Sequence, residues 1–441
     1  MADLLHGDGV EGDSMIPSSA ITTTNTDTNK DIVSNNTSES LDAKRPPFPK
    51  KKLALLFGYS GSGYSGLQVN PGCLTIESVI LDALPKAGLV WARNANQPKK
   101  IDWQRACRTD KGVHAVGNVI SFKGLLVTDF VDGQCGVIKG EEQKEWSSEY
   151  AVKMLNNHLP AEIRVFDIVR ATNSFDAHVQ CDSRFYEYTF PTFLLESEEY
   201  EFVEKPNTQS LGNDEATEET ESLRYEMTSE DMERVRSFRL TAEKVDLLKQ
   251  GLQCYTGTLN FHNFTIGKAP KDPSSMRFIR SFTVSKEPFV DSKTQIEWVS
   301  LRVHGASFML HQIRKMVGLV ILGIKYNLAL SGERLSKLVK DALQPENKWN
   351  IPKAPGQGLF LDKACFSGYN KYLKEHSNVD DNAQLSKDFI DFDKYEQQRE
   401  KLKEDLIYPA IFENTLPVFY GWQRALRAHS YEFKYLLQYM K

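Results

Sequence analysis

The chain has 441 residues, a length that accommodates two domain-sized units with additional segments. Hydrophobic residues make up 40% and aromatic residues 11%, enough to build a large core, and no run of about 18 apolar residues that could span a membrane occurs. The six cysteines are scattered without a Cys-x-x-Cys pair, which argues against a disulfide framework and favours a reducing compartment.

Charge is spread unevenly along the chain. Residues 1–43 carry a net charge of −7 and residues 196–231 carry −11, whereas the whole chain carries only −5. The residues outside these two acidic segments therefore carry +13. A basic body with acidic appendages is compatible with a polyanionic partner.

Residues 1–50 are predicted to form a disordered tail that ends in a basic cluster. The first 43 residues are rich in Ser, Thr, Asn and Asp and poor in aromatic residues. A mitochondrial presequence would instead be rich in Arg and short of acidic residues. The basic run at 44–52 is typical of a nuclear localisation signal, and its alternative reading is a solvated linker. We therefore expect a nuclear protein, with the mitochondrion or cytoplasm as alternatives.

A first structured region is predicted over residues 51–195. Lys52–Tyr59 alternates apolar and polar residues, which predicts a strand, and the glycine-rich run that follows must bend sharply. Thr75 is a predicted N-cap for a helix whose apolar residues recur at helical spacing. Further strands are predicted at 118–122, 162–170 and 184–190, and a helix at 147–158.

The remaining chain is predicted to hold an acidic insert, a second structured region and a helical extension. The insert spans 196–239, the second region 240–370 and the extension 371–441. The second region contains a helix capped by Thr241, strands at about 277–287 and 294–304, a helix at about 306–325 and a strand at 359–361. Strands interleaved with helices predict an α+β or α/β layer architecture.

The run Arg108-Thr109-Asp110-Lys111-Gly112-Val113-His114-Ala115 carries the strongest chemical signal. Its carboxylate is flanked by two cations, and neighbouring positive charge keeps an aspartate ionised as a nucleophile or base. The glycine allows the backbone to turn so that a bulky substrate can approach. Taken alone, the same run also fits a turn with a surface ion pair.

This run resembles the signature of the TruA family of pseudouridine synthases, Arg-Thr-Asp-x-Gly-Val-His-Ala. The resemblance extends over residues 52–192 and 240–370, and includes the opening loop Tyr59–Gln68 and the run Phe308–Gly318. It implies an α+β pseudouridine-synthase fold, with two α/β subdomains around a central antiparallel sheet, a catalytic cleft and, here, additional C-terminal helices. The family often has Asp where this chain has Ser60, and Arg where it has His178.

The resemblance also assigns roles to individual residues. Asp110 would be the nucleophile or general base, Arg314 its ion-pair partner, and Tyr186 the ring that stacks on the target base. Without the resemblance, Tyr186 fits a packed strand residue and Arg314 fits an arginine that caps its own helix face. RNA contacts are expected from five further residues: Arg108, Lys111, His114, His311 and Leu359.

Several features bring the match closer to the eukaryotic tRNA pseudouridine synthase 1 and 2 branch: the run Asn260–Thr265, the His311-Gln312 pair, the acidic insert and the C-terminal extension. This branch implies an isomerase that acts on tRNA, in the anticodon stem and loop, with small nuclear RNA and mRNA as further substrates. Phe261 and Phe264 could stack on bases or lie in the core. The extension is expected to leave a monomer rather than a dimer.

The isomerisation implied by the resemblance requires no cofactor, since no step transfers electrons. A structural zinc site is an alternative, built from the four residues Cys254, His262, His304 and His311, although no Cys/His cluster at ligand spacing occurs. Two rival functions are an RNA-binding folding chaperone without catalysis and an aspartate-dependent phosphatase. The glycine-rich loop lacks the Gly-Lys-[Ser/Thr] ending of a phosphate-binding loop, which argues against the phosphatase.

Overall fold

The computed structural model describes residues 50–95, 97–126, 130–131, 134–135, 147–202, 226–326, 332–376 and 388–440. Backbone contacts group Phe48–Lys441 into one unit. Nearly all of the predicted tail lies outside the described residues, as do residues 203–225 of the acidic insert. The boundaries predicted at residues 195, 239 and 370 stay predictions.

A nine-stranded sheet runs through the described part of the chain, in the order β6-β1-β3-β11-β7-β10-β9-β8, with β2 paired to β3. Its pairings are antiparallel except for β11 with β3, which is parallel. The strands are β1 (Lys50–Tyr59), β2 (Gln104–Arg105), β3 (His114–Leu125), β6 (Ile163–Arg170), β7 (Ser183–Pro191), β8 (Gly257–Asn260), β9 (Met276–Val290), β10 (Glu297–Gly305) and β11 (Leu359–Cys365), and a separate ribbon pairs β4 (Phe130–Val131) with β5 (Gln134–Cys135).

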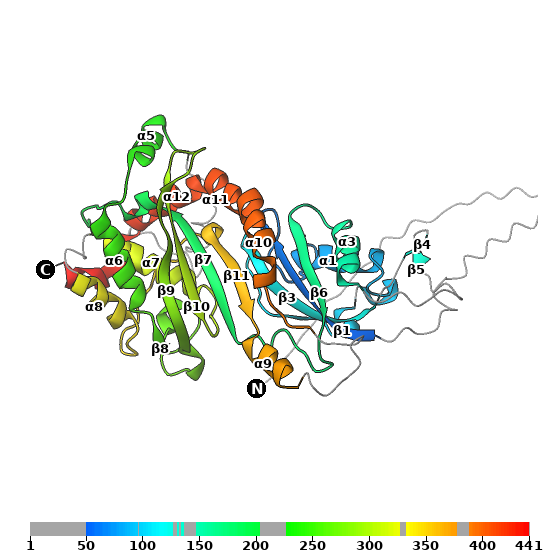
Figure 1. The fold of residues 1–441 in the computed structure, drawn as a ribbon. Coiled ribbons are helices and arrows are strands. Elements are labelled where there is room, and N and C mark those ends of the chain that lie inside the picture. The colour runs from blue at the N-terminus through cyan, green and yellow to red at the C-terminus, as the bar shows by residue number, and fades with distance from the viewer. Residues whose placement is uncertain are drawn as a thin grey trace, which may run out of the picture. The chain divides into compact units, whose positions relative to one another are not determined.

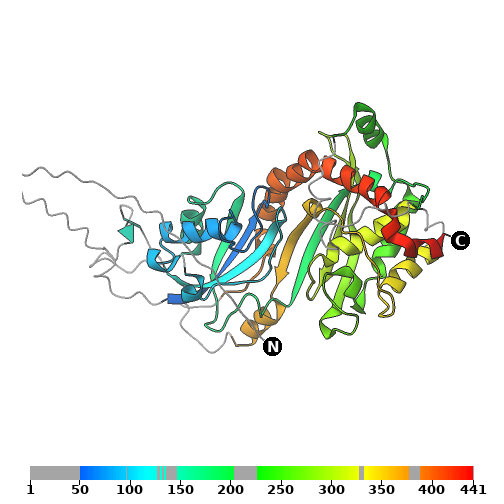
Figure 2. The ribbon, with the colours of Figure 1, turned by 180° about the vertical axis from the view of Figure 1, so that it is seen from behind.

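Helices pack along this sheet in groups. Figure 2 shows α7 and α8 beside α6 on the C-terminal half of the sheet, and these three helices contact one another. Helices α10 to α12 run from strands β1 and β3 to strand β7 (Figure 1). The helices are α1 (Ile76–Lys86), α2 (Ala92–Ala95), α3 (Ser148–Asn156), α5 (Ser229–Ser237), α6 (Ala242–Gln253), α7 (Gln312–Lys325), α8 (Gly332–Ala342), α9 (Ser367–His376), α10 (Glu396–Leu402), α11 (Tyr408–Asn414) and α12 (Leu416–Ala428).

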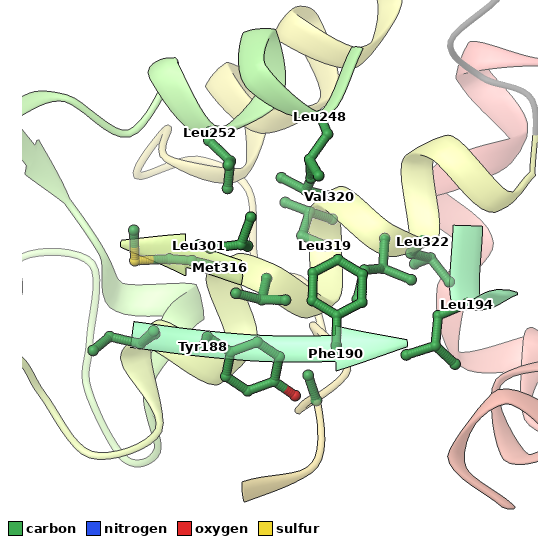
Figure 3. Packing of buried hydrophobic residues seen from close by; sticks show 14 of the residues in the cluster. Tyr188, Phe190, Leu194, Leu248, Leu252, Leu301, Met316, Leu319, Val320 and Leu322 are labelled. Carbon is green, nitrogen blue, oxygen red and sulfur yellow. The ribbon is translucent and has the colours of Figure 1, made fainter. Parts of the chain in front are cut away.

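Two clusters of buried hydrophobic residues form the core. One joins β7 and β10 to α6 and α7, and Figure 3 shows Tyr188 and Phe190 of β7 beside Met316 and Leu319 of α7. The other joins β1, β3 and β6 to α1 and α3. Tyr186 packs against both clusters, so the strand that carries it lies where they meet. The sequence-based architecture is therefore confirmed as a mixed α/β fold.

The C-terminal extension is tied to the sheet by a buried group of charges. Asp362 of β11 is 2% exposed and accepts from Arg399 Nη2 of α10 at 2.9 Å. Lys403 Nζ lies 3.1 Å and Arg302 Nη2 2.6 Å from the same carboxylate. Because breaking a buried pair leaves an uncompensated charge, these contacts hold the extension against the strand that carries Leu359.

The N-cap predictions are confirmed. Thr75 accepts from the amide of Ser78 at the start of α1, and Thr241 accepts from Lys244 at the start of α6. Among the helices of the described residues, none is long and apolar enough to cross a membrane.

Two expectations are wrong in part, and one open alternative is decided. The helix predicted from residue 306 begins at Gln312, because His311 adopts a left-handed backbone with φ 62°. Phe261 and Phe264 are fully buried and pack on one another at 5.6 Å, so they belong to the core and cannot stack on RNA. Lys52, part of the predicted nuclear signal, is buried in β1 and pairs with Asp102 at 2.9 Å.

Candidate active site

A pocket of about 490 Å³ opens where the two core clusters meet. Several segments wall it: residues 105–113, the residues around His178, the loop before α7 with the first turn of that helix, and the ends of β7 and β11. The lining residues are Arg105, Ala106, Cys107, Arg108, Thr109, Asp110, Val113, His178, Arg184, Tyr186, Ser307, Phe308, Met309, Leu310, His311, Gln312, Ile313, Arg314 and Leu359. Pairs of these residues are up to about 250 positions apart in the sequence, so only the fold gathers them.

Hydrogen bonds of neighbouring residues fix the turn that carries Asp110, while Asp110 itself is exposed. Thr109 is 7% exposed, and its hydroxyl lies 2.8 Å from the Tyr59 hydroxyl at the end of β1. The amide of Val113 donates to the Asp110 carbonyl at 3.1 Å, and Gly112 has φ 76°, which closes the turn. Thr109 and Val113, which are buried on the two sides of the turn, therefore fix the backbone where Asp110 lines the pocket.

The glycine-rich opening loop packs directly on this turn. The amide of Leu67 donates to the Thr109 carbonyl at 3.1 Å. A Cβ on Gly66 would lie 2.8 Å from the same carbonyl, and a Cβ on Gly61 would lie 2.3 Å from the Val113 carbonyl. The glycines are therefore required by close approach of two backbones, a reason that the sequence pattern alone did not give.

The prediction that His114 contacts RNA does not fit its position. His114 is 2% exposed and does not line the pocket. Its Nδ1 accepts from the amide of Gly61 at 3.1 Å and lies 3.2 Å from the Ser60 hydroxyl. Burial lowers the pKa of His114 to about 4, so the imidazole is neutral at physiological pH. Its role is to hold the opening loop.

Tyr186 lies in the pocket wall with its ring against Phe308. The two ring centroids are 5.3 Å apart and the planes meet at 84°, an edge-to-face contact. Burial raises the pKa of the Tyr186 hydroxyl well above its ordinary value, so the phenol stays protonated. A partly buried ring fixed by an aromatic neighbour is suited to receive a flat base.

Arg314 occupies the first turn of α7 and is 4% exposed. Its Nε donates to the Ala354 carbonyl at 2.6 Å, and a Cβ on Gly356 would lie 3.2 Å from its Nη1. Any side chain at position 356 would therefore crowd the Arg314 guanidinium. Arg314 and Asp110 line the same pocket, although they are 204 positions apart. Their ion pair stays a prediction.

The loop before α7 supplies a third wall. Because His311 has a positive φ, Ser307–Leu310 lie outside the helix and turn toward the pocket. The side-chain carbonyl of Gln312 accepts from the amide of Met309 at 2.9 Å and stabilises this turn. A non-glycine residue in the left-handed region costs about 1–3 kcal/mol and is concentrated at functional sites.

Positive charge dominates the pocket. Four arginines line it, at positions 105, 108, 184 and 314, and Asp110 is the only carboxylate among its described lining residues. Arg105 pairs with Glu77, a buried acid that also accepts from Trp103 Nε1 at 3.0 Å. The pocket is therefore electrostatically suited to an anionic ligand, with Asp110 as the single carboxylate among its described lining residues.

The predicted residues are distributed over two neighbouring pockets. Arg108 is exposed, and with His311 and Leu359 it lines the main pocket. Lys111 lines an adjoining pocket of about 390 Å³, which shares Arg108, Thr109 and Asp110 with the first. Most of the other lining residues were not predicted as site residues, among them Arg105, Cys107, Arg184 and Phe308. Cys107 lies next to the quoted run at Arg108, and Phe308 lies within a quoted run. For Cys107 and Phe308, the sequence signal that could have found them was their position beside or within a quoted run.

No group of three or more His, Cys, Asp or Glu residues within the described ranges is arranged to hold a metal ion. His262, one of the proposed zinc ligands, instead lies 2.8 Å through Nε2 from the Asn347 carbonyl and 3.2 Å through Nδ1 from Asn260. His304 stacks on Phe185 at 3.8 Å. The zinc alternative therefore has no support among these residues.

A mixed sheet with a carboxylate turn, a strand tyrosine and a helix arginine around one cationic pocket is consistent with an enzyme of the pseudouridine synthase class. The comparisons with known proteins agree. The tRNA pseudouridine synthase family profile matches residues 252–367. The tRNA pseudouridine synthase 1 of Kluyveromyces lactis is 35% identical, over 85% of this chain and 70% of its own length.

Relatives outside the budding yeasts agree as well. The tRNA pseudouridine synthase 1 of Schizosaccharomyces pombe is 33% identical, over 88% of this chain and 85% of its own length. The pseudouridylate synthase 1 homolog of Mus musculus is 32% identical, over 85% of this chain and 76% of its own length. The chain therefore belongs to the tRNA pseudouridine synthase family, whose members are isomerases that convert uridine to pseudouridine.

Proposed function

We propose that this chain isomerises uridine to pseudouridine in the anticodon stem and loop of tRNA, with Asp110 as its nucleophile or general base. The observation that carries this proposal is the pocket itself. It combines one carboxylate with the Tyr186 ring and a buried Arg314, and its other charged side chains are cationic. A ring suits contact with a nucleobase, cationic side chains suit RNA phosphates, and a carboxylate suits the reaction at the base.

The chemistry begins with removal of the base from its stack. Flipping the target uridine out of the RNA costs a few kcal/mol, and Arg108 at the exposed rim would fill the gap or hold a phosphate. The uracil would then lie against Tyr186 and Leu359. Both side chains line the pocket, and Leu359 is 9% exposed, which leaves an apolar contact for the ring.

Asp110 would next attack C1′ or remove the proton on C2′, which cleaves the bond between C1′ and N1. The uracil rotates in the pocket and C5 bonds to C1′, after which C5 loses its proton and N1 holds one. Product and substrate are isomers, so the sequence of steps consumes no electrons and we propose that no cofactor is needed. Arg314 would keep Asp110 charged and aimed.

Tritium release from uridine labelled at C5 of tRNA tests this proposal. We expect the wild-type chain to release tritium and Asp110→Asn to release none above background, because the amide is neither a nucleophile nor a base. Asp246→Asn, which alters an exposed aspartate on α6, is the matched control and should retain the wild-type rate. Equal rates in Asp110→Asn and the control would refute the assignment.

The same assay separates the enzyme from its rival, the folding chaperone. A chaperone would bind tRNA but release no tritium with either the wild-type chain or Asp110→Asn. Binding measured in parallel by filter retention identifies that outcome. An enzyme is favoured because Asp110, Tyr186 and Arg314 line one pocket.

The site of modification and the breadth of substrates rest on the branch resemblance and on relatives named for tRNA. We propose the anticodon stem and loop as the main target, with small nuclear RNA and mRNA uridines as further targets. Carbodiimide mapping of pseudouridine in total RNA, from cells with and without this protein, would locate the modified uridines. Modification confined to another tRNA arm would contradict the proposal.

We also propose a monomer in the nucleus. Helices α10 to α12 cover one face of the sheet, where Trp298 packs on Phe412 at 4.9 Å, so that face is not free to pair with a second copy. Sedimentation equilibrium would report the mass. The nuclear proposal rests on the basic run before Lys52, and a fluorescent fusion that lacks residues 44–49, which precede β1, should lose nuclear accumulation.

A further inference from the structure

Arg184 lies at the start of β7, between strands β11 and β10, and its partners across the sheet are Ala364 and Gly305. It is partly buried and lines the main pocket two residues before Tyr186. The reaction steps above assign it no role. Its guanidinium nevertheless donates to three backbone carbonyls in separate segments that lead into the pocket wall.

Three backbone carbonyls accept from the Arg184 guanidinium. Nη1 donates to the Ala306 carbonyl at 2.6 Å and, at a longer 3.4 Å, to the Cys181 carbonyl. Nη2 donates to the Ala106 carbonyl at 3.1 Å. Hydrogen bonds from a charged donor are stronger than neutral ones, so these contacts are costly to break.

Each carbonyl belongs to a different segment of the pocket wall. Ala106 precedes Asp110 by four residues, and Ala306 precedes Arg314 by eight. Cys181 follows His178 by three residues. One side chain therefore spans the segment that bears the predicted carboxylate and the segment that leads into the helix of the predicted arginine. Among the described residues, these two segments come from different halves of the sequence.

The surroundings of Arg184 reinforce this arrangement. No carboxylate of the described residues forms a salt bridge with it, and its polar neighbours include the thiols of Cys107 and Cys181 and the hydroxyl of Tyr186. Burial raises the pKa of the Cys107 thiol, whereas its hydrogen bond with Cys181 and then the Arg184 charge lower that pKa. A partly desolvated cation without a carboxylate partner relies on its carbonyl acceptors, and these hydrogen bonds hold the three segments in place.

We propose that Arg184 is a positioning residue that sets the spacing between the Asp110 turn and the loop leading to Arg314. This inference rests on the proposed pseudouridine synthase activity of the main pocket. Arg184 acts through the segments that it joins and not by contact with the reacting atoms. Displacing either segment by about 1 Å is enough to lower a catalytic rate about 100-fold.

A lysine cannot replace this geometry. Its ammonium keeps the positive charge but is a single point, whereas the planar guanidinium reaches carbonyls in separate directions. Arg184→Lys therefore keeps the positive charge but loses the contacts that set the spacing between the segments. Arg239→Lys is the matched control, because the Arg239 Nη1 also donates to two backbone carbonyls, of Arg236 and Phe238, at an exposed site that does not line the pocket.

The test measures kcat and KM for tritium release from C5-labelled tRNA, with the rate divided by the fraction of enzyme that binds tRNA. We expect Arg184→Lys to lower kcat about 100-fold while KM changes less than about threefold. Arg239→Lys should keep both values. The midpoints of thermal unfolding of the two variants should agree within about 4 °C.

Arg184→Gln provides a second variant in case the lysine variant does not fold, since its amide group donates hydrogen bonds without a positive charge. A wild-type kcat in either folded variant overturns the inference, and so does a loss confined to KM, which would make Arg184 an RNA contact. If the wild-type chain itself releases no tritium, the proposed function fails. If the wild-type and Arg184→Lys release it at equal rates, only the role of Arg184 fails.

Discussion

At the scale of single residues, His114 combines a motif position with a buried environment. It lies four residues after Asp110, yet its Nδ1 accepts from the amide of Gly61 in the opening loop. The ordinary pKa of a histidine is 6.5, and burial lowers that of His114 to about 4. The sequence placed this residue beside the active site but could not report that it faces protein instead of RNA.

This lowered pKa predicts a loss of stability in mild acid. Above pH 6.5 the folded and unfolded chains both keep a neutral imidazole, so His114 contributes no pH dependence there. Between pH 6.5 and 4 the unfolded chain binds a proton that the folded chain does not, so stability falls as pH falls. From pH 7 to pH 5 His114 should account for a loss of about 2 kcal/mol.

Urea unfolding of His114→Asn at both pH values measures this contribution. Asparagine retains an acceptor for the Gly61 amide but does not titrate, so the difference between the two pH values should shrink by about 2 kcal/mol relative to the wild-type chain. His178→Asn, at an exposed position, is the control and should keep the wild-type difference. An unchanged difference in His114→Asn would show that another group is responsible.

At the scale of elements, helix α7 connects the core to the active site. Its buried face packs on β7, as Figure 3 shows for Met316 and Leu319, while Arg314 in its first turn enters the pocket. Two of its glycines differ in what surrounds them. A Cβ on Gly318 would lie 2.1 Å from the Pro352 carbonyl, whereas a Cβ on Gly323 would meet the flexible side chain of Leu335 at 2.6 Å.

Gly318→Ala should destabilise the protein by about 3 kcal/mol, because a backbone carbonyl has to move and the gain in helix propensity recovers only about 1 kcal/mol. The displaced segment includes Ala354, whose carbonyl accepts from Arg314 Nε, so the rate of tritium release should also fall. Gly323→Ala is the matched control and should cost less than about 1 kcal/mol. Urea unfolding compares the two, and equal losses would contradict this account.

At the scale of the whole molecule, charge is divided between acidic appendages and a basic remainder. The net charge of −5 hides a balance of +13 outside the two acidic segments, and the pocket carries four arginines. If this basic part binds the RNA backbone, tRNA affinity must depend on salt, since each neutralised phosphate releases counterions. The total charge of −5 alone would have suggested a protein that repels the RNA backbone.

Contact with about four phosphates would weaken tRNA binding about 100-fold between about 50 and 200 mM salt. Lys111→Ala, in the adjoining pocket, should reduce the slope of log affinity against log salt by about one. Lys249→Ala is the control, since that exposed lysine on α6 pairs with Glu287 at 2.8 Å. Filter binding across a salt series measures the affinity of the wild-type chain and of both variants. An affinity of the wild-type chain that does not change with salt would exclude an interface dominated by phosphate contacts.

Much of this protein was predictable from the sequence. The 3.6-residue and two-residue periodicities and the caps at Thr75 and Thr241 located helices and strands, because these signals act over a few neighbouring residues. The run around Asp110 identified the family, since its residue types at fixed spacing are rarely found together. The start of α7 was missed, because the left-handed conformation of His311 depends on packing and not on local preference.

The tertiary structure alone decided which side chains share a pocket and which are buried. His114, Phe261 and Lys52 are in polar or aromatic motifs that suggested exposed roles, but burial assigns them to structure. Arg184 had no sequence signal of its own, since its acceptors are backbone carbonyls far from it along the chain. Periodicity reports what a residue prefers locally, whereas burial and long-range contacts depend on segments that only folding brings together.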